Sequence, residues 1–210
     1  MTTSDEVLLD RAIASTEPAD DTSRRVLDAA LTAFLDFGIR RTSMNEIAKR
    51  AGLGVATVYR RYPQKDQLVE AVILREAGRF VAEVDRRVGT VSSATDIAVE
   101  GFVAVVVGIR EHPLLRRLLV TEPEIVLPML TLRGGPVLAV GRGYLAGVIR
   151  RLRADGAIPD CDPEPVAELL ARIAHSLLLT PDGCIPGEDD EATRRFARSH
   201  VAPILTNSRD

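Results

Sequence analysis

Apolar residues recur at spacings of three and four along most of the chain, which is the period of α-helices that bury one face. Glycine and proline interrupt this pattern at intervals, and no stretch alternates as a half-buried strand does. Residues 1–20 lack a clear period, and we expect a mobile acidic arm there that could include a short helix near residues 7–13. The pattern therefore predicts an all-α protein with helices over residues 22–37, 43–51, 55–62, 65–88, 93–111, 113–121, 123–132, 137–155, 163–179 and 190–205.

Residues 43–65 carry the most informative pattern in the chain. Ser43 and Glu46 have the S-x-x-E spacing of a capping box, in which each side chain satisfies the other residue's free backbone N–H. Gly52 can adopt the left-handed conformation of a tight turn between two short helices. Helices joined in this way have the layout of a helix-turn-helix, which lays its second helix in the DNA major groove.

The distribution of charge agrees with a DNA-binding role, although the chain as a whole has a formal net charge of −3. Residues 24–65 carry nine Lys and Arg against three Asp and Glu, whereas residues 1–23 carry six acids and one base. A basic segment inside an acidic protein is the electrostatic footprint of a phosphate-binding surface. The alternative is that these charges merely solvate the helices.

The third predicted helix offers side chains of the kinds that contact DNA. Its tip consists of small residues, so its backbone can enter the groove, and the Thr57 hydroxyl can bond a phosphate or a base edge. The methyl groups of Val55 and Ala56 can meet a thymine methyl group. Arg60 is the candidate base reader because the arginine–guanine pair is the commonest specific contact. We expect Arg61 to face the DNA backbone or solvent.

Residues 22–74 closely resemble the N-terminal DNA-binding domain of the TetR family of bacterial transcriptional repressors. The resemblance implies a helix-turn-helix domain over residues 21–80, with the motif itself near residues 43–62. It also implies a C-terminal helical domain over residues 81–210 that binds an effector and dimerises. The matching elements are, in chain order, Ala33-Phe34, Phe37-Gly38, Thr42-Ser43, Ile47-Ala48, Ala51-Gly52-Leu53 and the run from Thr57 to Leu68.

The resemblance also implies roles for individual residues. In the family the first tyrosine of the run and the lysine that begins the next helix contact the DNA backbone, and these roles fall on Tyr59 and Lys65. Tyr62 occupies a position that is either a packing residue or a further backbone contact. Ser43 is either a helix cap, a phosphate ligand or both. The expected DNA-binding residues are Thr42, Ser43, Gly54, Val55, Ala56, Thr57, Tyr59, Arg60, Tyr62 and Lys65.

The helix predicted over residues 163–179 is apolar around most of its circumference. Such a helix must be buried on both sides, and in a domain of this size we expect the second side to meet another subunit. The resemblance likewise implies that the last two long helices form a four-helix bundle with those of a partner. The expected interface residues are Val166, Leu169, Leu170, Ile173, Leu177, Phe196, His200, Val201 and Ile204.

By resemblance, the protein is a homodimeric repressor that a small, apolar effector releases from a palindromic DNA operator. Activation instead of repression stays open, and the sequence identifies neither the effector nor the operator. Phe102, Met129 and Tyr144 are candidates for lining an effector pocket, with ordinary core packing as the alternative for each.

Other classes of function have little support. Cys161 and Cys184 match no metal spacing and no CxxC motif, so we expect neither a metal nor a cofactor. The chain contains no catalytic motif, which argues against an enzyme. Without a secretory signal or an apolar run of about 20 residues, we expect a cytoplasmic protein. The rival functions are a helical interaction or scaffold protein that does not read DNA and, further off, a helical enzyme that carries a DNA-binding module.

Overall fold

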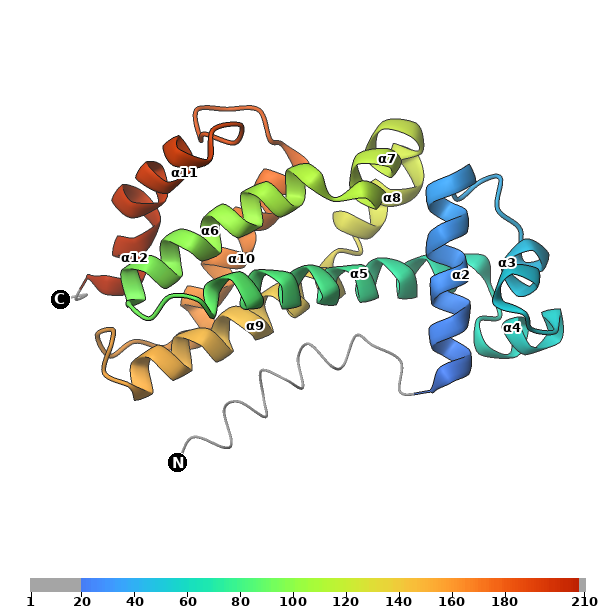
Figure 1. Ribbon diagram of the computed structural model, residues 1–210, viewed down its shortest axis with the longest axis horizontal. Helices are drawn as coiled ribbons and strands as arrows, with labels where there is room; N and C mark the ends of the chain where they lie inside the picture. The colour runs from blue at the N-terminus through green and yellow to red at the C-terminus, as the bar shows by residue number, and fades with distance from the viewer. Residues whose placement is uncertain (1–19, 208–210) are drawn as a thin grey trace. The chain divides into compact units, whose positions relative to one another are not determined.

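The computed structural model describes residues 20–207 (Figure 1). No strand occurs in that range, and the all-α prediction is confirmed. Apart from Asp20, the predicted acidic arm lies outside the described residues. The helices are α2 (Asp21–Phe37), α3 (Met44–Ala51), α4 (Val55–Arg61), α5 (Lys65–Val88), α6 (Ala94–Glu111), α7 (Pro113–Thr121), α8 (Pro123–Leu130), α9 (Gly135–Ala154), α10 (Pro163–Leu179), α11 (Asp190–Phe196) and α12 (Ala202–Thr206), with a π-helical turn η1 (Ala197–Val201) between the last two.

The predicted boundaries agree with these helices to within two residues, except that the last predicted helix is not continuous. It divides into α11, the π turn and α12. Pro203 accounts for the change of register, because proline has no N–H to donate to the carbonyl four residues earlier. Among the described residues, no single helix is long and apolar enough to cross a membrane, and α8 with α9 meets that test only as a bent pair.

Local signals set the ends of the first helices. The Asp20 side chain caps α2 by accepting from Ser23 N, and Gly38, at φ 81°, ends the helix. The Ser43 hydroxyl accepts from Glu46 N at 3.1 Å at the start of α3. The Glu46 carboxylate accepts from Arg50 Nε instead of reaching back to Ser43, so among the described residues only one bond of the predicted capping box forms. Gly52 ends α3 in the left-handed conformation expected of it.

The chain divides into two compact units, and the first consists, in its described part, of residues 20–78 and 112–137. Its core joins α2, α3, α4 and the first half of α5, with α7 packing against α2. The residues that fill it are fully or almost fully buried, and they include Val26, Ala30, Phe34, Ile47, Val58, Leu68 and Val69. The unit therefore contains the predicted helix-turn-helix together with two helices, α7 and α8, from much later in the sequence.

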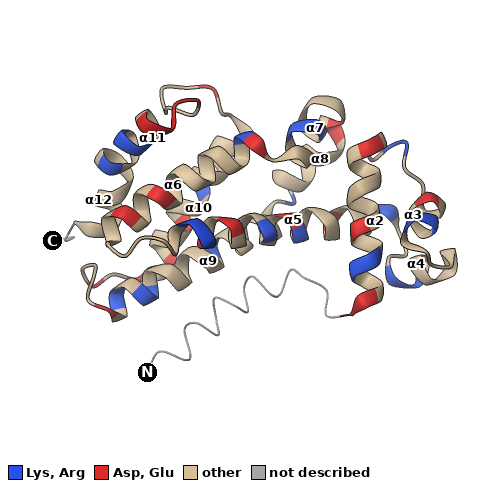
Figure 2. Cartoon of the chain, in the orientation of Figure 1, with Lys and Arg blue, Asp and Glu red and all other residues tan. Residues whose placement is uncertain are grey.

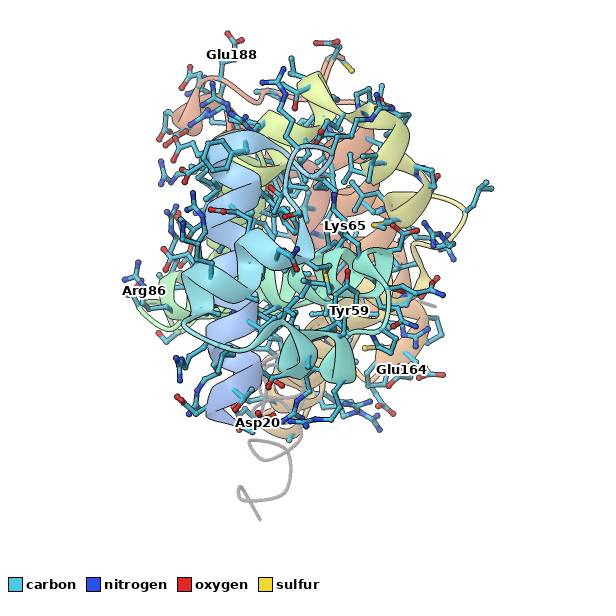
Figure 3. All side chains as sticks on the ribbon, turned by 90° about the vertical axis from the view of Figure 1, so that its right-hand side faces the viewer. Asp20, Tyr59, Lys65, Arg86, Glu164 and Glu188 are labelled. Atoms are coloured by element: carbon cyan, nitrogen blue, oxygen red, sulfur yellow. The ribbon has the colours of Figure 1, made fainter. Side chains whose placement is uncertain are left out.

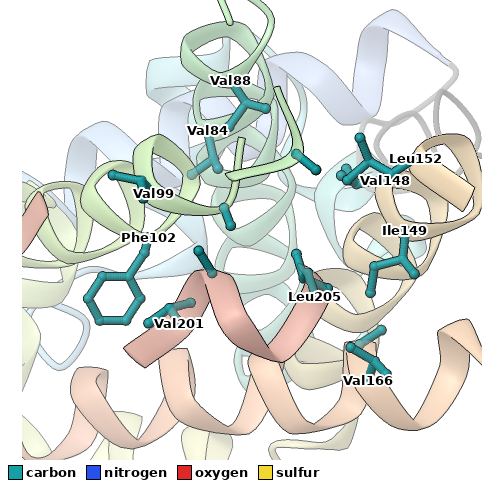
Figure 4. Packing of buried hydrophobic residues seen from close by; sticks show 14 of the residues in the cluster. Val84, Val88, Val99, Phe102, Val148, Ile149, Leu152, Val166, Val201 and Leu205 are labelled. Atoms are coloured by element: carbon teal, nitrogen blue, oxygen red, sulfur yellow. The ribbon is translucent and has the colours of Figure 1, made fainter. Parts of the chain in front are cut away.

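The second unit consists of residues 79–111 and 138–207 in its described part. Its core lies between the second half of α5, α6, α9, α10 and the C-terminal helices, as the labelled side chains in Figure 4 show. Valine and alanine dominate this core, which also contains the aromatic residues Phe102 and Tyr144. Helix α6 packs most closely on the π turn and α12.

Candidate DNA-binding surface

The tip of α4 presents small side chains to solvent. Gly54 precedes the helix in an extended conformation and, having no side chain, forms no side-chain cap. Val55 and Ala56, the first two residues of the helix, are exposed. Val55 is 40% exposed, which is high for a valine in a folded unit. Thr57 is half-buried, whereas Val58 on the opposite side of the helix is fully buried in the core. The tip therefore has little bulk to prevent its backbone from approaching another molecule.

Behind the tip, two large side chains project from α4. The Tyr59 ring is 47% exposed, and in Figure 3 it lies on the face turned toward the viewer. Arg60 is exposed and forms no ion pair with any residue of the described range. Arg61 differs, because it donates to the Asp20 carboxylate at 2.8 Å and is thereby tied to the start of α2. Two neighbouring arginines thus have different roles, and Arg60 is the one that is available to a ligand.

Tyr62 and Lys65 flank the end of α4 and are both half-buried. Burial raises the pKa of the Tyr62 phenol, and the neighbouring Ser23 and Arg61 oppose that shift. The Lys65 ammonium donates to Arg40 O at 3.4 Å. Burial lowers the pKa of the Lys65 ammonium, against the effect of nearby carboxylates. Both side chains are less accessible than Tyr59 or Arg60.

The two candidates at the start of α3 differ in accessibility. Thr42 is only 2% exposed, and its hydroxyl donates to Gly38 O at 2.7 Å and to Ala33 O at 3.2 Å. This side chain holds the turn between α2 and α3 from the inside. Ser43 is exposed while it caps α3, so its position allows both of the roles expected for it.

Much of the basic charge in this unit is used internally (Figure 2). The Arg25 guanidinium donates to Ala51 O at 2.7 Å and Gly52 O at 3.2 Å, at the end of α3. Arg50 bonds Glu46 and Asp36 and stacks on the Phe37 ring. The bonds of Arg25 and the Arg50–Asp36 pair have no signal in the local sequence, because each depends on which helices pack together. The Arg50–Glu46 pair, by contrast, joins residues four apart within α3. Among residues 24–65, the basic side chains with neither an ion pair nor a side-chain hydrogen bond in the described range are Arg41, Lys49 and Arg60.

Comparison with known proteins identifies this arrangement. The family model for bacterial regulatory proteins of the tetR family matches residues 26–72, which span α3, α4 and most of α2. Residues 26–72 are therefore a DNA-binding domain of the TetR family. The chain is therefore a DNA-binding transcriptional regulator, like the curated relatives that it matches.

The similarity to TetR-family proteins extends beyond the helix-turn-helix. An uncharacterised HTH-type transcriptional regulator of Mycobacterium tuberculosis is 29% identical over 186 residues, which cover 87% of this chain and 84% of the relative. The TetR-family repressor AlkX from Dietzia sp. has the same fold, with a TM-score of 0.68 and 21% identity over 86% of this chain and 93% of AlkX. The R. erythropolis repressor QsdR matches with a TM-score of 0.65 and 21% identity, over 92% of this chain and 100% of QsdR.

The candidate effector residues do not form one site. Phe102 and Tyr144 belong to the core of the second unit. The Tyr144 hydroxyl is buried without a hydrogen-bond partner in the described range, and burial together with the Asp85 carboxylate raises the pKa of this phenol. Met129 lies in the first unit, where it lines a cleft of about 420 Å³. The other residues around that cleft are Ile39, Arg40, Lys65, Asp66, Glu124, Ile125, Pro128 and Arg133.

The candidate interface residues of this chain divide into two sets. Val166 and Val201 are 2% and 7% exposed and belong to the core of their own unit. Leu169 is 46% exposed, and His200 is exposed too. The half-buried members of the set are Leu170, Ile173, Leu177, Phe196 and Ile204. Helix α10 therefore buries one side against its own unit and leaves an apolar side partly open.

Proposed function

We propose that this regulator is a homodimeric, cytoplasmic repressor that reads a roughly palindromic DNA operator with α4. The observation that carries the proposal is the surface of α4, where a tip of small residues adjoins exposed Tyr59 and unpaired Arg60. A helix of this shape fits the major groove, and a dimer presents two such helices to two half-sites.

The contacts that we propose divide into positioning contacts and base readout. Tyr59, Lys65 and Ser43 would bond phosphates, and Thr57 and the methyl groups of the tip would face the floor of the groove. Arg60 would read a guanine. Tyr62 is half-buried and would touch the backbone through its hydroxyl only. Thr42 would act from the interior, by holding the turn that presents Ser43. Gly54, Val55 and Ala56 complete the surface.

Dimerisation through α10 and the C-terminal helices is supported by the partly open apolar side of α10. A leucine that is 46% exposed on a helix whose opposite side is buried leaves apolar area for a partner to cover. Leu169, Leu170, Ile173, Leu177, Phe196, His200 and Ile204 would form this interface, with Val166 and Val201 supporting it from beneath.

We propose further that a small apolar effector binds within the second unit and favours a conformation that does not fit the operator. The aliphatic lining of this unit's core, with Phe102 and Tyr144 among it, supports an apolar ligand. Release of DNA then follows because the effector binds one conformation more tightly than the other.

Titrations of DNA by single variants test the proposed readout. The probes are a duplex selected from a random library by the wild-type chain and a scrambled duplex of equal composition. Arg60→Ala should lose about 1–3 kcal/mol on the selected duplex and little on the scrambled one. Tyr59→Phe and Lys65→Ala should weaken both. Arg61→Ala is the matched control, since that arginine is tied to Asp20, and it should change the preference least.

An equal loss on both duplexes for Arg60→Ala would exclude its role as a base reader. The rival functions are tested by the wild-type chain itself. A DNA reader loses affinity steeply between about 50 and 200 mM salt and keeps its sequence preference. A scaffold protein would show no preference at any salt concentration, and an enzyme would turn over a substrate.

A further inference from the structure

The corner between α7 and α8 places a buried carboxylate against the helix-turn-helix. Glu122 is only 7% exposed. Its side chain accepts from Ile39 N at 2.5 Å and from Arg40 N at 2.9 Å, across 83 and 82 residues of sequence. Because a carboxylate has two oxygens, each backbone N–H has an acceptor of its own. Two backbone donors in the turn before α3, one buried and one part-buried, thus depend on one distant side chain.

Gly38 leaves the room that this contact needs. Its φ of 81° lies in a region that side-chain-bearing residues rarely adopt. A Cβ atom on Gly38 would also lie 3.0 to 3.1 Å from the Glu122 carboxylate. Glycine is therefore favoured at position 38 for two reasons: the backbone conformation of the turn and the space that the Glu122 carboxylate occupies.

The same turn holds residues of the DNA-binding surface in place. Gly38 O accepts from the Thr42 hydroxyl at 2.7 Å, directly before the Ser43 cap of α3. Arg40 O accepts from the Lys65 ammonium at 3.4 Å. Both Ser43 and Lys65 are proposed to bond phosphates. The backbone that Glu122 fixes therefore supports two proposed phosphate contacts, one on each side.

We propose that Glu122 is a positioning residue for DNA recognition, which holds the turn at residues 38–40 so that Ser43 and Lys65 meet the operator backbone together. This inference rests on the proposed reading of an operator by α4. A carboxylate near this surface repels DNA phosphates, so its charge alone disfavours binding. Loss of the charge and loss of the hydrogen bonds consequently predict opposite changes in affinity, which makes the proposal testable.

The test compares Glu122→Gln with Glu124→Gln in the full chain. Both variants remove one negative charge from the same corner, but Glu124 is exposed and pairs with Arg40 through its side chain only, at 2.5 Å. Glutamine at position 122 can accept from one of the two backbone N–H groups and turns a donor toward the other. We expect Glu122→Gln to bind both duplexes about tenfold more weakly than wild type, because the contacts that it misplaces are phosphate contacts, which do not depend on the DNA sequence. We expect Glu124→Gln to bind both duplexes as tightly as wild type or more tightly.

The outcomes separate this inference from the proposed function. If the wild-type chain shows no preference between the duplexes, the proposed function itself is wrong. If the wild type is selective but Glu122→Gln binds both duplexes more tightly, as Glu124→Gln does, the inference is overturned. A loss of binding that comes with a loss of α2 amide protection overturns it too, because general damage to the fold would cause that result.

A second variant covers the case in which Glu122→Gln fails to fold, as judged by its thermal melt. Glu122→Asp keeps the charge but is one methylene too short to reach both backbone N–H groups. Weaker binding of both duplexes supports the proposal, and unchanged affinity overturns it. In whichever variant folds, exchange of the Ile39 and Arg40 amide protons should accelerate while the α2 amide protons stay protected.

Discussion

Arg25 lies in the basic segment, yet its contacts are internal, and this leads to a prediction about stability. Its guanidinium donates to the carbonyls of Ala51 and Gly52, at 2.7 and 3.2 Å, where α3 ends and the turn of the motif begins. A net contribution of about 1–2 kcal/mol follows from two charge-assisted bonds of which one is exposed to solvent. Arg25→Ala should therefore lower the free energy of unfolding by that amount and the Tm by a few degrees.

Arg24→Ala is the matched control for this prediction. It removes the same charge from the neighbouring position, but within residues 20–207 the only ion pair of Arg24 is an exposed one with Asp21 at 3.6 Å. Such pairs contribute little, so this variant should stay within about 0.5 kcal/mol of wild type. Urea unfolding followed by circular dichroism measures both variants. Equal losses of stability in the two variants, or none in Arg25→Ala, would refute the claim that Arg25 closes the end of α3.

Three further predictions concern the second unit. Tyr144→Phe should leave the free energy of unfolding unchanged or raise it by about 1 kcal/mol in urea titrations, because the phenol hydroxyl is buried without a hydrogen-bond partner in the described range. A clear loss of stability would mean that this hydroxyl is hydrogen-bonded. Leu169→Glu should shift the protein toward monomer in sedimentation velocity, whereas Val120→Glu on α7, where the valine is 81% exposed, should not. The hydrogen bonds from Arg86 and Arg87 lower the pKa of Glu83 from 4.5 to about 2. The contribution of these pairs to stability is therefore complete above pH 4.5 and is lost as the pH falls toward 2. The difference in urea midpoint between wild type and Glu83→Gln should accordingly be largest at pH 7 in low salt and vanish near pH 2.

The helices were predictable because their determinants are local. An apolar period identifies the buried side, and residues such as Ser43 and Gly52 fix the ends through backbone groups a few positions away. The family resemblance drew on the same local residues between α2 and the start of α5. The prediction failed locally at the π turn, where a proline at position 203 shifts the register of a helix that it does not end. It also failed at Glu46, whose carboxylate bonds Arg50 and does not reach back to Ser43.

What the sequence did not predict depends on partners far away in the chain. Nothing near Glu122 indicates that its carboxylate receives two backbone N–H groups from the turn before α3. The domain boundary at residue 80 that the resemblance implied likewise does not predict that residues 112–137 belong to the same unit as the helix-turn-helix. Helical periodicity tells which side of α7 and α8 is buried, but it does not tell which element covers that side.

The same limit applies to the two arguments that pointed to function. The excess of positive charge in residues 24–65 suggested a phosphate-binding surface, but Arg25, Arg50 and Arg61 are committed to the fold itself. The apolar circumference of α10 suggested a partner, but it did not separate Val166, which packs inward, from Leu169, which is open. In both cases composition predicts that a surface binds a partner. The packing of distant elements decides which side chains remain available to bind that partner. On α4 the available side chain is Arg60, because Arg61 is paired with Asp20.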